Sequence, residues 1–207
     1  MGLFKVIRRL ILRSINLELE LLIKKFQPKQ ALEIGCGFNS PFITLLNKHQ
    51  VNCFGLDIDP KVITQLKESA SYKQVIWADA TKIPLKNGIF DMVIIGFVLH
   101  GVTATNRAMI VLEAKRVLKN NGLLVIIDVC TPASWIGRGL SLWCDLEEKF
   151  LGRLNPEHYY NYRDFLKNDI EGTMVDNPTN LITKTKKGFF GNIRLLCFWI
   201  ASAVASQ

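Results

Sequence analysis

The sequence lacks a long uninterrupted apolar run, a paired cysteine motif and a cluster of histidines. Charges interrupt the N-terminal segment, the last apolar run (Leu195–Ala205) is too short, and no small-residue cleavage site is present, so we expect neither a membrane-spanning helix nor a secretory leader. The five cysteines are an odd number without a Cys-x-x-Cys pair, which is typical of reduced, buried thiols in a cytoplasmic protein. Because His49, His100 and His158 are far apart, we expect no metal site.

Positive charge is concentrated at the N-terminus. The net charge is +8, and residues 1–30 contain seven basic residues against two acidic ones, whereas a nucleic-acid-binding protein would more often spread its basic residues over a folded face. Residues 3–25 fit an amphipathic helix with apolar residues on one side and basic residues on the other: Lys5, Arg9 and Arg13. Two interpretations of residues 1–28 stay open. They form either a helix folded over the domain, as a lid, or a basic helix on an anionic membrane surface.

A glycine turn organises the start of the domain that we expect over residues 29–207. The apolar run Ala31–Ile34 predicts a short strand, and Gly35-Cys36-Gly37 predicts a tight turn after it, where the missing side chains let the backbone approach a ligand. We expect Ser40 to cap the following helix and Pro41 to take its first position. In an open α/β sheet, a polar or anionic small molecule binds at such a turn.

Strands and helices alternate through the next hundred residues. We expect further strands at 51–56, 74–77, 90–95 and 123–129, and helices at 41–49, 60–69 and 104–118. Asn120-Asn121-Gly122 predicts a left-handed stop before the fifth strand, whose continuous apolar character is typical of a sheet covered on both faces. This alternation predicts an α/β fold with a doubly wound, mostly parallel sheet. Residues 180–186 and 192–203 predict two final strands.

Two acidic residues follow the second strand. We expect Asp59 to cap the helix that begins at Pro60, which leaves Asp57 free of that structural task. A carboxylate at the end of a strand, about 20 residues past a glycine turn, is placed to accept hydrogen bonds from ribose hydroxyls.

Five segments occur in the order and spacing of one known family. They are Leu32-Glu33-Ile34-Gly35-Cys36-Gly37, Gly55-Leu56-Asp57-Ile58-Asp59-Pro60, Ala78-Asp79-Ala80, Phe90-Asp91-Met92-Val93 and the run from Glu113 to Gly122. Over roughly residues 30–130 the sequence resembles the class I S-adenosylmethionine-dependent methyltransferases, in particular the branch that acts on small molecules and isoprenoid quinones. The resemblance implies a Rossmann-like methyltransferase fold with a seven-stranded sheet and an antiparallel C-terminal strand. It also implies S-adenosylmethionine as the cofactor.

The resemblance implies cofactor contacts at the turn. Gly35, Cys36 and Gly37 would bring the backbone close to the methionine portion of the cofactor, and Glu33 would orient the loop or the cofactor's amino group. The alternative for Glu33 is that it only braces the turn, and Cys36 is expected to be a small packing residue rather than a nucleophile. The family often has a third glycine where this chain has Asn39, a residue that tolerates left-handed backbone better than other non-glycine residues.

Further cofactor contacts are implied at the ends of the next strands. Asp57 would bind the ribose hydroxyls, and Ile58 would lie against the adenine. Asp79, flanked by Ala80, would accept a hydrogen bond from the adenine amino group, or alternatively cap a loop. Gly96 would offer backbone contacts beside the reacting methyl group.

The catalytic residues are unknown from the sequence. His100, His158 and Tyr160 are candidates for a general base, which is needed only where the nucleophile must lose a proton. A packed or solvent-facing histidine is the alternative for His100. The aromatic-rich segment 131–170 is a candidate insertion that shapes an apolar or aromatic acceptor pocket, with ordinary core packing as its alternative.

The expected function is methyl transfer from S-adenosylmethionine to a small-molecule acceptor by in-line displacement. An NAD-dependent oxidoreductase is disfavoured, because Ser40 stands where its third fingerprint glycine would fall. Two alternatives stay open. One is an RNA or protein methyltransferase of the same fold, although nucleic acid is a disfavoured partner. The other is a non-catalytic cofactor-binding module at a membrane surface. We expect a cytoplasmic protein, with peripheral membrane contact through residues 3–25 as the further interpretation.

Overall fold

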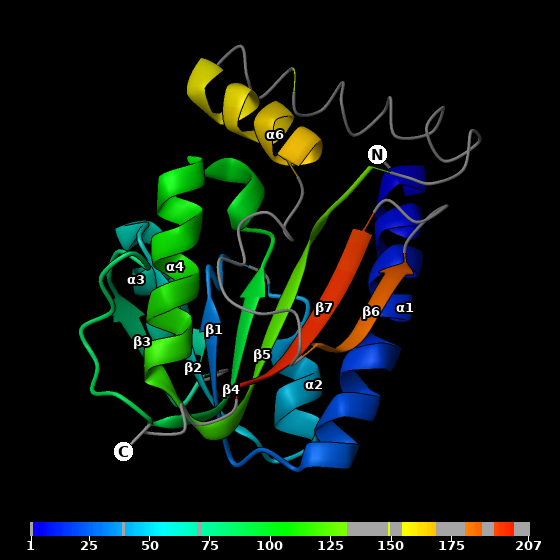
Figure 1. Ribbon diagram of the computed structural model, residues 1–207. Coiled ribbons are helices and arrows are strands. Elements are labelled where there is room, and N and C mark those ends of the chain that lie inside the picture. The colour runs from blue at the N-terminus through cyan, green and yellow to red at the C-terminus, as the bar shows by residue number, and fades with distance from the viewer. Residues whose placement is uncertain are drawn as a thin grey trace.

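The computed structural model describes residues 2–38, 40–69, 72–131, 149, 155–168, 181–187 and 193–200 (Figure 1). The helices are α1 (Gly2–Phe26), α2 (Ile43–Lys48), α3 (Pro60–Ser69), the short 3-10 helix η1 (Leu99–Gly101), α4 (Ala104–Val117) and α6 (Pro156–Asn168). The strands are β1 (Gln30–Ile34), β2 (Asn52–Asp57), β3 (Gln74–Trp77), β4 (Phe90–Gly96), β5 (Leu118–Val129), β6 (Leu181–Lys187) and β7 (Ile193–Ile200).

Seven strands form one sheet in the order β3-β2-β1-β4-β5-β7-β6. The strands from β3 to β5 pair in parallel, whereas β7 is antiparallel to both β5 and β6. The order reverses beside β1, so the chain leaves β1 for β2 on one side and returns to β4 on the other. Open α/β sheets bind ligands at such a reversal, outside the carboxyl ends of the strands. The predicted doubly wound sheet with an antiparallel C-terminal strand is confirmed.

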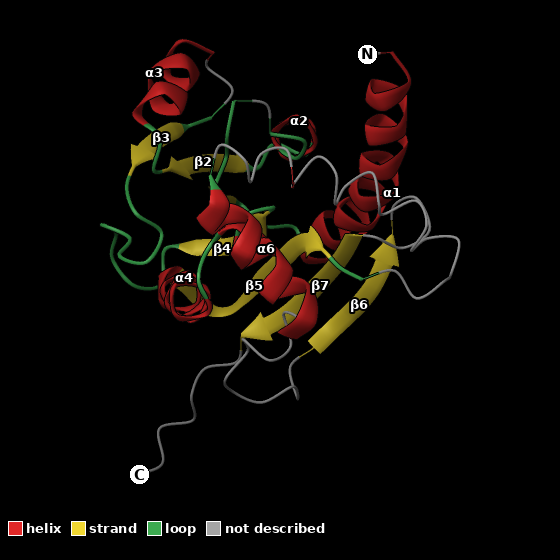
Figure 2. Cartoon of the chain, turned by 90° about the horizontal axis from the view of Figure 1, so that it is seen from above, coloured by secondary structure: helices red, strands yellow, loops and turns green. Residues whose placement is uncertain are grey.

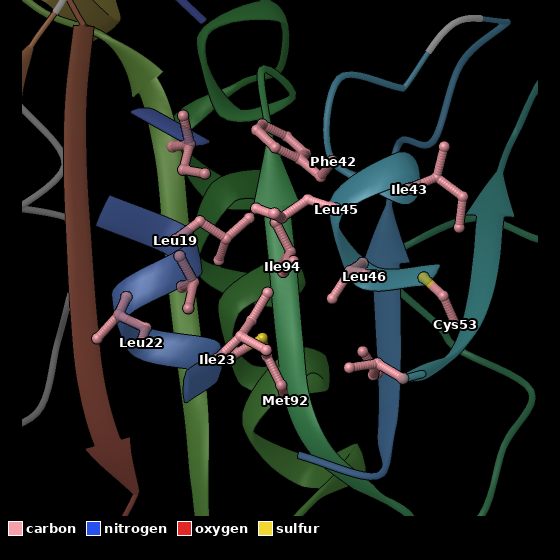
Figure 3. Packing of buried hydrophobic residues seen from close by; sticks show 14 of the residues in the cluster. Leu19, Leu22, Ile23, Phe42, Ile43, Leu45, Leu46, Cys53, Met92 and Ile94 are labelled. Atoms are coloured by element: carbon pink, nitrogen blue, oxygen red, sulfur yellow. The ribbon is translucent and has the colours of Figure 1, made fainter. Parts of the chain in front are cut away.

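Helices cover both faces of the sheet, and β5 is therefore apolar and buried from Leu123 to Ile127. On one face, side chains of α1 and α2 pack against alternate residues of β4; Figure 3 shows Leu19 and Ile23 beside Ile94 and Met92. On the other face, α4 packs its apolar side against the intervening strand residues. Because the second half of α1 belongs to this core, residues from Ile15 to Ile23 anchor that helix on the domain.

Two local predictions differ from the structure. The helix expected from Pro41 begins at Ile43, although Ser40 still caps it, since its Oγ accepts hydrogen bonds from the N–H groups of Phe42 (3.0 Å) and Ile43 (3.2 Å). Asn121 has the expected left-handed backbone (φ 64°) but lies within β5, which starts at Leu118 and continues through it. The pairing of β5 with β4 accommodates this residue by a shift of register between Phe90 and Met92.

The helix α6 lies above the carboxyl ends of the central strands (Figure 2). Together with residues 131, 149 and 155, α6 is the described part of segment 131–170; the rest of that segment lies outside the described residues. Within the described ranges, no helix has the length and apolar character needed to cross a membrane. The same residues contain no group of metal-ligating side chains.

Candidate active site

The glycine turn after β1 uses its own N–H groups within the protein. Those of Gly35 and Cys36 donate to the Leu56 carbonyl (2.8 and 3.2 Å), and that of Gly37 donates to Asp57 Oδ2 (2.9 Å). Gly35 and Gly37 have φ angles of 72° and 54°, which glycine adopts at little cost. Among the described residues, a Cβ at Gly37 would meet only the Gly35 carbonyl oxygen, at 4.0 Å, so these residues leave the space beside Gly37 open.

Asp57 lies at the end of β2, where it faces the turn. Besides the bond from Gly37, its Oδ1 accepts a hydrogen bond from the Asp59 N–H (3.0 Å). These two bonds fix the carboxylate, and each oxygen retains a further lone pair for a ligand hydroxyl. Asp59 instead caps α3, because its Oδ1 accepts from the Lys61 N–H (2.8 Å). The predicted division of labour between the two carboxylates is thus seen in the structure.

Glu33 is buried beneath the turn. Its carboxyl group accepts hydrogen bonds from the Ser40 hydroxyl (2.6 Å) and the Tyr72 hydroxyl (2.9 Å). Burial raises the pKa of Glu33 to about 7, although these two hydroxyl donors partly oppose the shift. Through Ser40, which also caps α2, Glu33 ties the turn to the following helix. This geometry favours the bracing role over a direct cofactor contact.

The third strand end contributes exposed residues. Asp79 Oδ1 accepts from both the N–H and the hydroxyl of Thr81 (2.8 Å each), so Asp79 does shape its loop, while within the described part of the chain its Oδ2 has no hydrogen-bond partner. Ile58 is exposed, Ala80 is half-buried, and the Trp77 indole N–H donates to the Ile58 carbonyl (2.9 Å). These residues leave an apolar surface beside Asp57 and Asp79.

Two predicted positions are filled by packing. The Cys36 side chain lies in the core, and burial raises the pKa of its thiol to about 12, so the side chain is no nucleophile. A Cβ at Gly96 would lie 2.5 Å from Phe42 Cε2, so this glycine makes room for an aromatic ring. The predicted ligand contacts of Cys36 and Gly96 would therefore have to be made by their backbones.

The candidate bases separate into two groups. His100 lies on η1, with its ring 5.7 Å from that of His158 and 6.2 Å from that of Tyr162, both on α6. Tyr160 is 72% exposed, and the structure does not bring it into this cluster. The His100 Nδ1 lies 2.6 Å from Oδ1 of Asp128, a fully buried residue at the end of β5. The sequence reasoning missed Asp128, although a lone acidic residue closing an apolar strand is a usable signal.

A buried arginine holds α6 over η1. From α4, Arg107 donates through Nε to the Leu99 carbonyl (2.9 Å) and through its other nitrogens to Asp164 Oδ2 (2.8 Å) and the Asn161 carbonyl (2.7 Å). Its guanidinium also lies 4.9 Å from the centroid of the Phe165 ring. One side chain thus joins three elements, which was not foreseen from the sequence.

Comparisons with known proteins agree with this architecture. Residues 32–126 match a family model described as a methyltransferase domain. The chain is 26% identical over 108 residues to an uncharacterized methyltransferase of Synechocystis, covering 52% of this chain and 50% of that protein. It is 25% identical over 184 residues to a demethylmenaquinone methyltransferase of Thermotoga maritima, covering 87% and 78%. The chain thus spans about half the length of the first of these relatives.

Solved structures share the fold. A methyltransferase of Aquifex aeolicus that depends on S-adenosylmethionine superposes with a TM-score of 0.57 at 18% identity, covering 88% of this chain and 89% of that one. Sheet order, glycine turn and strand-end carboxylate therefore define a Rossmann-like fold of the methyltransferase type. The matching family model and these relatives show that the central part of the chain is similar to S-adenosylmethionine-dependent methyltransferases.

The turn region fits the cofactor of this family. Because the turn's three N–H groups are engaged within the protein, they offer no nest for a phosphate, and S-adenosylmethionine carries none. Among the described residues, the Gly35 carbonyl accepts no hydrogen bond, so it is available to a donor on a ligand. The contacts of Asp57 with the ribose and of Asp79 with the adenine stay predictions.

Proposed function

We propose that this chain transfers the methyl group of S-adenosylmethionine to a small-molecule acceptor by in-line displacement. The bond between the Gly37 N–H and Asp57 Oδ2 (2.9 Å) carries the proposal, because it fixes a carboxylate beside an open glycine turn. The cofactor supplies an activated methyl group on a sulfonium, so the chain's task is mainly to align the reactants and exclude water. The Thermotoga maritima relative, named for demethylmenaquinone, supports a small-molecule acceptor.

Calorimetry with S-adenosylmethionine and with S-adenosylhomocysteine tests the donor site. We expect both to bind, and we expect Asp57→Asn to weaken both about 10-fold or more, because a hydrogen bond to a charged group is lost. Asp59→Asn is the matched control, since asparagine caps a helix as well as aspartate does. Failure of both ligands to bind the unaltered protein contradicts the proposal. Binding without turnover on RNA, protein or small molecules favours a binding module, whereas turnover on RNA or protein favours those alternatives.

We further propose that α1 contacts an anionic membrane surface. Opposite its buried side, α1 exposes Leu17 (58%) and Leu21 (62%), one turn apart, with the exposed Arg13 one turn before Leu17. Apolar side chains flanked by basic ones are typical of helices that lie at a lipid interface. An interfacial helix at the rim of the domain would also suit a lipophilic acceptor.

Vesicle co-sedimentation tests this contact. Removing residues 1–27 would strip the core of Ile15, Leu19 and Ile23, so truncation is a poor test. We instead expect the double substitution of Leu17 and Leu21 by serine to reduce recovery with vesicles of anionic lipid, and added salt to reduce it further. Leu112→Ser, at an exposed leucine of α4 on the other face, is the matched control. Equal recovery of all three proteins in the supernatant contradicts the contact.

A further inference from the structure

Asp128 is a fully buried carboxylate that the donor site does not use. Its Oδ2 accepts from the backbone N–H groups of Leu99 (2.9 Å) and His100 (3.3 Å), and its Oδ1 accepts from the N–H of Val129 (2.8 Å). The His100 Nδ1 lies 2.6 Å from the same Oδ1. Both oxygens of this buried carboxylate are thus engaged as hydrogen-bond acceptors, and the three N–H bonds compensate its lost hydration.

This environment determines the tautomer of His100. Because both Asp128 oxygens already accept backbone N–H bonds, we place the hydrogen of the short contact with a neutral His100 on Nδ1, which puts the imidazole lone pair on Nε2. Asp128 also stabilises the imidazolium that forms when Nε2 takes up a proton. The same logic of a buried carboxylate behind an imidazole orients the general base in hydrolytic triads.

The segment that carries His100 begins against the donor turn. A Cβ at Gly35 would lie 2.1 Å from Val98 Cγ2, so the glycine turn packs directly on the residue that precedes η1. Two residues further on, the His100 side chain is 12% exposed, which shields it from bulk water. His158 closes over the next residue, because a Cβ at Gly101 would lie 3.1 Å from its Cε1.

From this geometry we infer that His100 is the general base of methyl transfer, with Asp128 as its positioning residue, and that the acceptor is a protic nucleophile. This inference rests on the proposed function. The acceptor's X–H proton passes to His100 Nε2, and the X electron pair forms the bond to the donor methyl carbon. The methyl–sulfur bond breaks with its electron pair on sulfur, and His100 later releases the proton to water. A tertiary amine or a thioether acceptor needs no such base.

Nuclear magnetic resonance titration of the histidine rings tests this inference without an acceptor. We expect His100 to carry its neutral-form proton on Nδ1. We also expect its titration midpoint to lie lower with S-adenosylmethionine bound than with S-adenosylhomocysteine bound, by about half a pH unit or more, because the sulfonium charge opposes a nearby imidazolium. A residue that only caps η1 would not respond to that charge. The charged and titratable groups facing His100 are Asp128 on β5, His158 and Tyr162 on α6, and, through Leu99, Arg107 with its partner Asp164.

The same spectra contain the control. His49, at the end of α2 and 3.2 Å from Glu20, contacts none of these groups and should titrate identically in both complexes. Asp128→Asn should lower the titration midpoint of His100. If that variant does not fold, the comparison of the two complexes of the unaltered protein still tests the inference. An Nε2–H tautomer, or equal His100 midpoints in the two complexes, overturns the inference. Failure of both ligands to bind refutes the proposed function instead.

Discussion

Two neighbouring regions at the carboxyl edge of the sheet are built in different ways. The turn region (residues 33–38, 40, 57–59 and 79) is joined by bonds between its own residues that are at most 20 apart in the sequence, such as Gly37 with Asp57. The dyad region, named for the pair His100 and Asp128, comprises residues 99–107, 128 and 156–168. It is joined by bonds such as that of Arg107 with Asp164, 57 residues apart. The first is fixed as soon as neighbouring strands and helices form, whereas the second needs the whole chain in place.

The largest expected effect tests the rigidity of the turn region. Gly35→Ala adds a Cβ 2.1 Å from Val98 Cγ2 at a positive φ, so we expect a loss of about 4 kcal/mol of unfolding free energy. Gly88→Ala is the control, because its φ of 66° is similar but its nearest atom is 3.9 Å away, and it should cost only about 1 kcal/mol. Urea denaturation measures both. Equal losses would show that the clash with Val98 is relieved.

The next prediction concerns the protonation of the Glu33 carboxyl group, which is buried beneath the turn. Glu33 has a folded-state pKa of about 7 against an ordinary value of 4.5, so its stabilising effect is fully present below pH 4.5 and is lost as the pH rises through 7. We expect Glu33→Gln to remove this dependence, so that the variant gains up to about 3 kcal/mol relative to the unaltered protein between pH 4.5 and 8. Denaturation at several pH values measures it. Parallel stability curves would contradict the prediction.

A smaller effect should separate the two regions. Arg107→Met removes the bonds that hold α6 and is expected to cost about 2 kcal/mol, with faster amide hydrogen exchange in residues 156–168. The turn region should keep its exchange rates and its affinity for S-adenosylmethionine. Arg116→Met is the matched control, since Arg116 bonds Glu113 and the carbonyls of Ile83 and Leu85, far from α6. Uniformly faster exchange in both regions would show that they unfold together.

The smallest expected loss of unfolding free energy comes from removing the helix cap at Asp59, beside the turn. Asp59→Ala loses the bond to the Lys61 N–H and should cost about 1 kcal/mol, whereas Asp59→Asn should cost almost nothing. Thermal unfolding of the two variants measures the difference. A large loss in both would mean that the charge of Asp59, rather than the cap, stabilises the turn region.

The contrast between the turn region and the dyad region also explains which features can be predicted from the sequence. The sheet, the cap at Asp59 and the meeting of Gly37 with Asp57 follow from local signals: glycines, strand-end carboxylates and alternating elements. The contacts of Asp128 and Arg107 do not, because nothing near either residue indicates a partner that lies 28 or 57 residues away. The start of α2 was placed two residues early: Ser40 bonds the N–H groups of Phe42 and Ile43 as a cap does, but the regular helix begins only at Ile43.

The buried thiols provide a way to time the opening of each region. Cys36 lies in the turn and Cys130 follows β5, and both are buried. Burial raises the pKa of the Cys36 thiol to about 12, so almost no reactive thiolate exists while the turn is closed. The alkylation rate of each cysteine, measured by mass spectrometry, therefore reports how often the structure around it opens. Native cysteines make this possible without introducing a label.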